Sequence, residues 1–270
     1  MSSIATNINA ARAEHAMTDA AQQVDKSTLQ LATGRRINSA ADDTAGMAIG
    51  SKLTAQSISL QRAMHNANDG VSMLQTADGA AGSMTDALTR MREIALQAAN
   101  DTNSDSDRLA LDNEFTQLRE HLGASIDGAK WNGKKLLDGS TASVNLQIGA
   151  SSGDGHAVDM ADFRGLSALT AAGISSRGDA LSALDAIDSS LASIDEARVK
   201  WGANMNRLVH ASDSSSNVAL HLDDSRSKII DADYAKATAD LAKAQILQMA
   251  GKAMLSQANQ APISVLRLLR

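Results

Sequence analysis

The chain has 270 residues, no cysteine and a formal net charge of −6 at pH 7, which excludes disulfides and thiolate chemistry and argues against nucleic acid, whose phosphates select a basic surface. Hydrophobic residues reach 43% but aromatic residues only 2%, a composition that suits narrow helix–helix seams better than a thick globular core. No apolar run is long enough for a membrane span, and the N-terminus lacks the apolar region of a secretory signal peptide.

The first predicted element is a helix near the N-terminus that stops at Gly34. Its apolar positions repeat at three-and-four spacing, the period of one helix face: Met17, Ala21, Val24 and Leu31. Glycine adopts the left-handed conformation that ends many helices, and Arg35 and Arg36 would favour the negative C-terminal end of the helix dipole.

Residues 33–53, TGRRINSAADDTAGMAIGSKL, are therefore expected to stop one helix and start the next. Asn38 or Ser39 is the predicted cap of the second helix, because a side-chain oxygen there can accept from free backbone amides. Asp42 and Asp43 would then lie in the first turn, where the dipole is positive. Taken alone, the stretch is punctuation between two helices.

A sustained heptad-like series predicts that the second helix is very long. The apolar positions hold one phase over more than six heptads: Leu53, Leu60, Met64, Ala67, Val71, Leu74, Ala81, Leu88, Ala95 and Ala99. The polar interruptions are Ser57, Asp78, Thr85 and Arg92. At 1.5 Å per residue, a helix from about 43 to 99 would span roughly 85 Å.

Residues 101–112, DTNSDSDRLALD, imitate a calcium loop but lack its central glycine and its final glutamate. Ser104 and Asp107 instead have the spacing of a capping box. A weak calcium site stays open as the alternative, but the stretch is predicted to be a loop that ends in a helix cap. A shorter helix is then expected over 111–122.

The middle of the chain, 128–178, breaks the helical pattern. GAKWNGKK at 128–135 has the glycine and lysine spacing of a phosphate loop, but Lys135 replaces the hydroxyl residue that holds magnesium and no strand precedes it, so a turn is favoured. Alternating residues on either side of a Gly-Asp-Gly turn predict a β-hairpin that pairs about 143–149 with 155–160. Residues 164–178 are expected to be irregular.

Two further helical series close the chain. The first runs through Leu184, Ile187, Leu191, Ile194, Trp201, Met205, Leu208, Ala219 and Leu222. The second runs through Ala244, Leu247, Gly251, Met254, Ala258, Ala261, Val265 and Leu268. An alanine-rich seam buries little apolar area, at about 25 cal/mol per Å². The segments 1–33 and 235–270 are therefore expected to become ordered against copies of themselves.

These elements predict a mainly α fold, a long coiled-coil-like helical hairpin or bundle with paired N- and C-terminal helices and a small β-hairpin in its central region. The six histidines are scattered and form no H-E-x-x-H pair, so no metal site is predicted. No catalytic arrangement or substrate pocket is indicated either. We therefore expect no enzyme activity and no cofactor.

Several longer motifs carry a specific family resemblance. They are LATGRRINSAADDTAGMAIGSKL at 31–53, NANDGVSMLQTADGA at 66–80, MREIALQAANDTNSDSDR at 91–108, WNGKKLLDG at 131–139, NLQIGA at 145–150, and the C-terminal stretch from IIDADYAKATAD to VLRLLR. In these motifs the chain resembles bacterial flagellin of a type with a short centre. The resemblance covers both ends and most of the middle.

The resemblance implies a subunit that is exported unfolded and polymerises at the cell surface into the flagellar filament, which supports motility. Residues 1–42 and 228–270 would form the inner layer, 43–127 and 179–227 the outer helices, and 128–178 the small outward region. Export chaperone, cap and junction proteins would be its partners besides its own copies. The implied assembly residues are Arg35, Arg36, Asn38, Asp42, Asp43, Leu247, Met254, Ala258, Val265 and Leu268.

The resemblance also implies a surface for an innate immune receptor of animals at Arg90, Ile94 and Glu114, where Ile94 replaces the leucine usual in strongly recognised flagellins. Two alternative functions stay open at this point. One is a cell-surface adhesin that binds anionic extracellular polysaccharide through Lys134, Lys135 and Arg164. The other is a hook–filament junction protein, which shares the terminal helices.

Overall fold

The computed structural model describes residues 6–169 and 173–268, and it is mainly α-helical, as predicted. The chain divides into two compact units, one made of residues 1–55 and 221–270 and the other of residues 56–220. We call them the terminal unit and the central unit.

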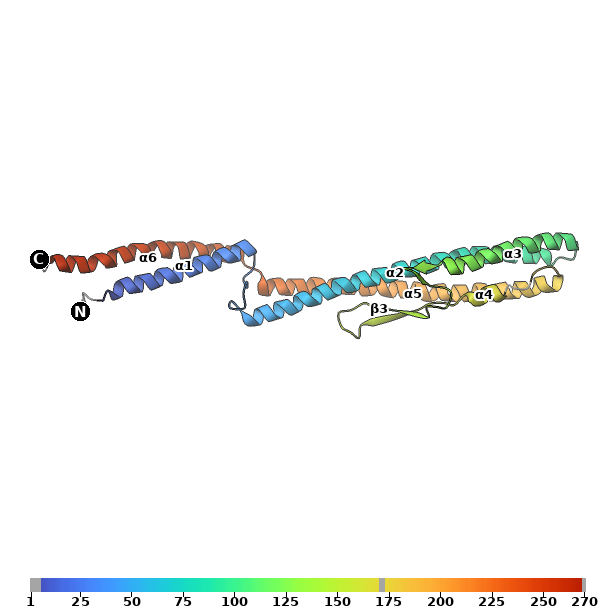
Figure 1. Cartoon of the computed structure of the whole chain (residues 1–270), viewed down its shortest axis with the longest axis horizontal. Helices are drawn as coiled ribbons and strands as arrows, with labels where there is room; N and C mark the ends of the chain where they lie inside the picture. Colours follow the sequence, from blue (N-terminus) through green and yellow to red (C-terminus); the bar gives the residue numbers. More distant parts are fainter. Residues whose placement is uncertain (1–5, 170–172, 269–270) are drawn as a thin grey trace. The chain divides into compact units, whose positions relative to one another are not determined.

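In the terminal unit the two ends of the chain lie side by side. Helix α1 (Ile8–Thr33) packs along α6 (Tyr234–Leu268), and the start of α1 lies beside the last turns of α6 (Figure 1). The Asn7 side-chain amide donates to the Ala258 carbonyl at 2.9 Å, and the Tyr234 hydroxyl donates to the Leu31 carbonyl at 3.3 Å. These bonds tie both ends of the pair, so the predicted pairing of the terminal helices is confirmed.

The seam between α1 and α6 is narrow because small residues fill it. Where the structure describes the side chains of these two helices, the buried ones are Ala20, Ser27, Ala237 and Ala244. Gly251 lies where a Cβ atom would be 3.4 Å from the Cβ of Met17, so the helices approach closely there. This seam buries far less apolar area than a core of leucines would, and the pair therefore gains little stability from its own packing.

The central unit has a continuous core. Helix α2 (Thr44–Ala98) lies beside α5 (Arg177–Ile230), and α3 (Asp105–Gly128) returns along the far end of α2 (Figure 1). The helix predicted for about 43–99 is therefore confirmed. The large side chains with less than 2% exposure among the described residues all lie here, and they include Leu74, Met84, Leu88, Met91, Ile94, Phe115, Leu122, Leu136, Leu137, Ile174, Ile187, Ile194, Trp201 and Leu208.

Polar residues that interrupt the apolar series of α2 and α5 form ion pairs between these two helices. The Arg198 guanidinium donates to Asp78 at 2.7 Å, and both residues break the apolar series of their helices. Arg92 donates to Asp188, also at 2.7 Å. Such pairs contribute little free energy at half-exposed positions, but they favour one helix register over its alternatives.

Two small antiparallel ladders follow α3. Strand β3 (Ser143–Gln147) pairs with β4 (Gly155–Asp159), which confirms the predicted hairpin. The sequence patterns did not reveal β1 (Lys130–Trp131) and β2 (Lys134–Lys135). Asn132 and Gly133, with φ of 47° and 80°, form the two-residue turn between them, a geometry that suits Asn-Gly in tight hairpins. The stretch that imitates a phosphate loop is thus a β-turn.

The expectation that 164–178 is irregular is wrong at both ends, because α4 spans Arg164–Leu169 and α5 begins at Arg177. The Asp162 carboxylate accepts from the Arg164 amide at 3.0 Å and so caps this short helix. Phe163 and Leu166 are buried beside it and hold it on the core. Residues 170–172 lie outside the described part of the chain.

Within residues 6–169 and 173–268, no helix combines the length and the apolar character needed to cross a membrane.

Candidate functional site

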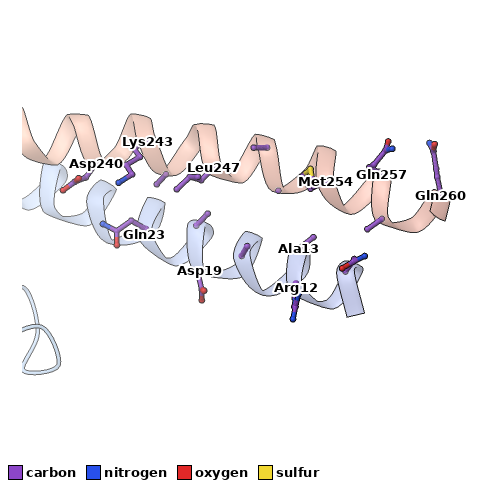
Figure 2. A pocket seen from close by; sticks show the side chains of 17 residues that line it. Arg12, Ala13, Asp19, Gln23, Asp240, Lys243, Leu247, Met254, Gln257 and Gln260 are labelled. Carbon is purple, nitrogen blue, oxygen red and sulfur yellow. The ribbon is translucent and has the colours of Figure 1, made fainter. Parts of the chain in front are cut away.

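A groove of about 1270 Å³ runs along the α1–α6 pair (Figure 2). Both helices contribute side chains at three-and-four spacing. From α1 these are Asn9, Arg12, Ala13, Ala16, Asp19, Ala20 and Gln23. From α6 they are Asp240, Lys243, Ala244, Leu247, Ala250, Gly251, Met254, Gln257, Ala258 and Gln260. Two parallel rows with this period have the form that receives ridges of a further helix.

The groove has a small-residue floor and apolar side chains that stand above it. Alanines and Gly251 make up most of the floor, whereas Leu247 and Met254 project from α6 and are 52% and 62% exposed. Charged residues such as Arg12 and Asp240 lie along its length. An apolar groove with polar members is the usual character of a surface that associates with another protein.

Helix α6 is also apolar on the side away from the groove. Ile246 and Met249 are 61% and 62% exposed, and in the helical repeat they lie off the row that Leu247 and Met254 occupy. Helix α6 has one polar side, with Gln245, Gln248 and Lys252 at helical spacing, but exposed apolar side chains on two other sides are normally covered by a further surface. The terminal unit by itself leaves much of α6 exposed to solvent, so its sequence is suited to a more covered environment.

The break between α1 and α2 is built partly as predicted. Gly34 ends α1 in the left-handed conformation, with φ of 70°. The Arg36 guanidinium, however, donates to the Ile229 carbonyl at 2.6 Å, and the Arg36 amide donates to the Ile230 carbonyl. Arg36 therefore caps the C-terminal end of α5, which corrects the expectation that both arginines serve the preceding helix. The Arg35 backbone forms an isolated bridge with Asp231.

The cap of α2 is Asp43, not Asn38 or Ser39. Its carboxylate accepts from the Gly46 amide at 2.8 Å, and its carbonyl accepts from the Met47 amide. Asp42 instead closes the turn before the helix, where it accepts from the amides of Asn38 and Ser39 at 3.2 and 3.0 Å and pairs with Lys26 at 3.2 Å. Asn38 and Ser39, the expected caps, thus donate their backbone amides, and the carboxylates of Asp42 and Asp43 accept.

These contacts hold the pKa of Asp42 at about 2, chiefly through the backbone hydrogen bond from Asn38, then Lys26 and the backbone of Ser39. A carboxylate with a depressed pKa stabilises the fold fully above its unfolded pKa of about 3.9, and this contribution is lost as the pH falls through the folded value. We expect the melting temperature of wild type to exceed that of Asp42→Asn at pH 5, with the difference shrinking between pH 4 and pH 2. Thermal denaturation followed by circular dichroism measures this, and a difference that does not change over that window would contradict it.

The residues expected for an immune receptor do not share one surface. Arg90 and Glu114 are exposed and joined, with the guanidinium donating to the carboxylate at 2.8 Å, and Glu93 adds a second contact to Arg90. Ile94, at 1% exposure, lies in the core. Of the C-terminal residues named above, Leu247, Met254 and Ala258 line the groove, whereas Val265 and Leu268 lie where α6 side chains are outside the described residues.

The basic side chains considered for polysaccharide are largely neutralised. Lys135 pairs with Asp127 at 2.7 Å and with Asp138 at 3.4 Å, and Arg164 pairs with Asp162 at 2.8 Å. Lys134 alone is exposed without a carboxylate within ion-pair distance among the described residues. The arrangement provides no concentrated positive surface for an anionic polymer.

The acidic stretch 101–112 is also engaged. Ser104 and Asp107 form the predicted capping box, Asp101 lies 3.5–3.8 Å from Arg108 and Arg177, and Asp112 accepts from the Ile174 amide. In the described part of the chain, no group of three or more acidic or histidine side chains is placed to hold a metal ion.

Long paired helices with exposed apolar side chains on the last one are features of the class of helical proteins that associate with other chains. Comparison with known proteins narrows the class. Residues 4–142 match the family model of the bacterial flagellin N-terminal helical region, and residues 184–269 match that of the flagellin C-terminal helical region. The chain belongs to the bacterial flagellin family.

Relatives agree along nearly the whole chain. It is 41% identical to a flagellin of Halalkalibacterium halodurans over 267 residues, with 98% of each chain covered, and 31% identical to flagellin A of Vibrio anguillarum, again with 98% of each covered. The crystal structure of Bacillus cereus flagellin is 30% identical, with a TM-score of 0.53 over 56% of this chain and 88% of that one. A flagellar hook-associated protein of Vibrio parahaemolyticus has a TM-score of 0.63 over 70% of this chain and all of its own, but at 19% identity it supports the fold alone.

The centre of the chain is shorter than in the Vibrio relatives. The alignment with the Vibrio anguillarum protein extends over 373 positions, so that relative contains a long segment without a counterpart in these 270 residues. Here the two family matches leave only residues 143–183 between them, which hold the β3–β4 hairpin, α4 and the start of α5.

Proposed function

We propose that the groove along α1 and α6, together with the outer face of α6, forms the contacts between copies of this chain in its filament. Membership of the flagellin family makes the chain a structural subunit of the bacterial flagellar filament. The observation that carries the proposal is the exposure of apolar side chains on both sides of α6 beside a seam that buries mostly alanine. Packing against other copies would bury these side chains and supply the stability that the seam lacks.

The layer assignment is part of this proposal. Residues 1–42 and 228–270 would make the inner layer, 43–127 and 179–227 the outer helices, and 128–178 the outward region. It is supported by the chain breaks between α1 and α2 and between α5 and α6, and by the fully covered core of the central unit.

Export in an unfolded state, an export chaperone, and the cap and junction proteins also belong to the proposal. A seam of small residues between α1 and α6 favours them, because a weakly held terminal pair can be unfolded at little cost and bound by another protein before assembly. The assembled protein would lie outside the cell. An innate immune receptor would contact Arg90 and Glu114, since Ile94 is buried in the folded chain.

Seeded polymerisation tests the main proposal. Purified chain mixed with short filament fragments should elongate them into long filaments visible by electron microscopy, and amide exchange in α1 and α6 should slow on assembly. Monomers that persist in the presence of seeds, or filaments in which the α6 amides still exchange freely, would refute the assigned contacts.

The two arginines of the break should separate assembly from stability. Arg36→Ala removes the guanidinium from the C-terminal carbonyls of α5 and is expected to lower the free energy of unfolding by about 0.3–1 kcal/mol. The Arg35 side chain is exposed, and the residue is bound to Asp231 through its backbone. Arg35→Ala should therefore change the free energy of unfolding by less than about 0.5 kcal/mol but slow seeded elongation. Urea denaturation and elongation rates distinguish them, with Arg35→Lys as the control that retains growth. Equal effects of the two alanine variants on both measurements would count against the division.

A further inference from the structure

The most exposed and the most buried methionines of the described residues lie in different units, whereas Met17, Met64 and Met205 are half-buried. In the terminal unit Met47, Met249 and Met254 are 40%, 62% and 62% exposed. In the central unit Met73, Met84, Met91 and Met160 are at most 9% exposed. A chain with no cysteine has thioethers as its only sulfur atoms, and among the described residues the most exposed ones lie in the unit that is proposed to assemble.

We propose that Met249 and Met254 of α6 are oxidation sites through which a peroxide-class oxidant blocks assembly of the free subunit. The thioether sulfur attacks one peroxide oxygen, the O–O bond breaks as the S–O bond forms, and the second oxygen leaves as water. The sulfur is oxidised to the sulfoxide and the peroxide is reduced, so hydrogen peroxide supplies the whole balance of the step.

The position of the two side chains gives the oxidation its effect. Met254 lines the groove in the same row as Leu247, two turns further along α6, and Met249 lies on the other side of α6 near Ile246 (Figure 2 shows Met254 and Leu247). A sulfoxide converts an apolar, adaptable side chain into a polar one that needs a hydrogen-bond donor when it is buried. Neither side of α6 could then be covered by another apolar surface without leaving that oxygen unpaired.

The same geometry makes the modification selective. Met84 and Met91 have no exposure and lie in the core of α2, so oxidation of the exposed thioethers leaves the central unit folded. In the monomer Met249 and Met254 are open to solvent, but copies packed on α6 would cover them. The inference rests on the proposed assembly surface and adds a form of regulation to it. Peroxide oxidises Met249 and Met254 in free subunits, whereas assembled subunits are protected from it.

The test treats folded monomer and preformed filaments with dilute hydrogen peroxide for the same time and maps the sulfoxides by peptide mass spectrometry. In the monomer, Met249 and Met254 should oxidise at least tenfold faster than Met84 and Met91. Seeded elongation by the oxidised monomer should fall at least fivefold while circular dichroism stays unchanged. Incubation with methionine sulfoxide reductases A and B and dithiothreitol should restore growth.

Matched variants locate the effect. Leucine has nearly the volume of methionine and no reactive sulfur, so the double variant Met249→Leu with Met254→Leu should elongate normally before and after peroxide. Met47→Leu removes the third exposed thioether and should remain sensitive. If the double variant does not elongate at all, the single leucine variants are measured, and each should lose part of the peroxide sensitivity.

The outcomes are distinct. Complete oxidation of Met249 and Met254 with unchanged elongation would overturn the inference, as would equal oxidation rates for exposed and buried methionines. Equal oxidation rates of Met249 and Met254 in filaments and in monomers would contradict the claim that assembly protects them. Failure of untreated wild-type chain to elongate seeds would instead count against the proposed function.

Discussion

Removal of residues 235–270 is expected to abolish filament growth while the central unit stays folded. The deletion takes away nearly all of α6 and leaves α1 without the helix it packs on. None of the residues in the core of the central unit falls within the deleted range. The truncated chain should therefore remain soluble and helical by circular dichroism, unfold cooperatively, and fail to extend seeds under the electron microscope.

A point variant gives the same test without removing the helix. Leu247→Asp places a carboxylate in the groove, where burial by a second copy would leave it unpaired, so we expect at least a hundredfold loss of elongation, corresponding to about 3 kcal/mol for an unpaired buried charge. Because Leu247 is 52% exposed, monomer stability should hardly change. Leu247→Met, which keeps the apolar volume, should elongate like wild type. Normal growth of the aspartate variant would exclude the groove as a contact.

The helices and the main hairpin were predictable because their signals are local. A three-and-four repeat that holds its phase from Leu53 to Ala99 can only be satisfied by one long helix, and α2 runs from Thr44 to Ala98. Alternation on both sides of a Gly-Asp-Gly turn likewise determines which residues pair in β3 and β4. Each of these inferences depends on residues within a few turns of one another.

The contacts that fix the site were not predictable, because they join residues far apart in the chain. Nothing near Arg36 in the sequence shows that its guanidinium will bind the carbonyl of Ile229, nor that Asp78 and Arg198 will meet across two helices. Ile94 shows a different limit. A helix that packs on one partner buries one side of its surface. Helix α2 packs on both α3 and α5, so a wider part of its surface is buried, and Ile94 lies within it.

The exposed face of α6 was missed for a related reason. Ile246 and Met249 lie outside the phase of the series that contains Leu247 and Met254, so a search for one seam passes over them. The useful signal was the presence of apolar residues on two sides of α6, with one narrow polar side through Gln245, Gln248 and Lys252, which indicates a helix that is covered on more than one side. The main apolar repeat of a helix identifies the side that packs on its first partner. Apolar residues outside that repeat indicate that a second partner covers another side.

The largest loss of monomer stability is expected from Trp201→Ala. Trp201 is 1% exposed, its ring lies edge-on to Phe163 with centroids 6.2 Å apart, and its indole nitrogen donates to the Asp159 carbonyl at 3.3 Å. One side chain thus joins α5 to β4 and to the residue before α4. Truncation would leave a large cavity and an unpaired carbonyl, at a cost of about 3–5 kcal/mol.

Urea denaturation of the monomer measures this cost, and hydrogen exchange shows where it acts. Exchange should accelerate most at the β3–β4 amides, whose strand β4 loses its anchor on α5, while Trp201→Phe retains part of the packing and should cost less than half as much. Below the variant's melting temperature the α1–α6 pair is unaltered, so the variant should still extend seeds. Leu247→Asp and Trp201→Ala are then complementary variants, since the first loses assembly and keeps monomer stability, and the second loses monomer stability and keeps assembly.

A Trp201→Ala variant that unfolds like wild type would show that the β3–β4 hairpin is stabilised by its own hydrogen bonds. A variant that folds but cannot assemble would place part of the subunit contact on the central unit.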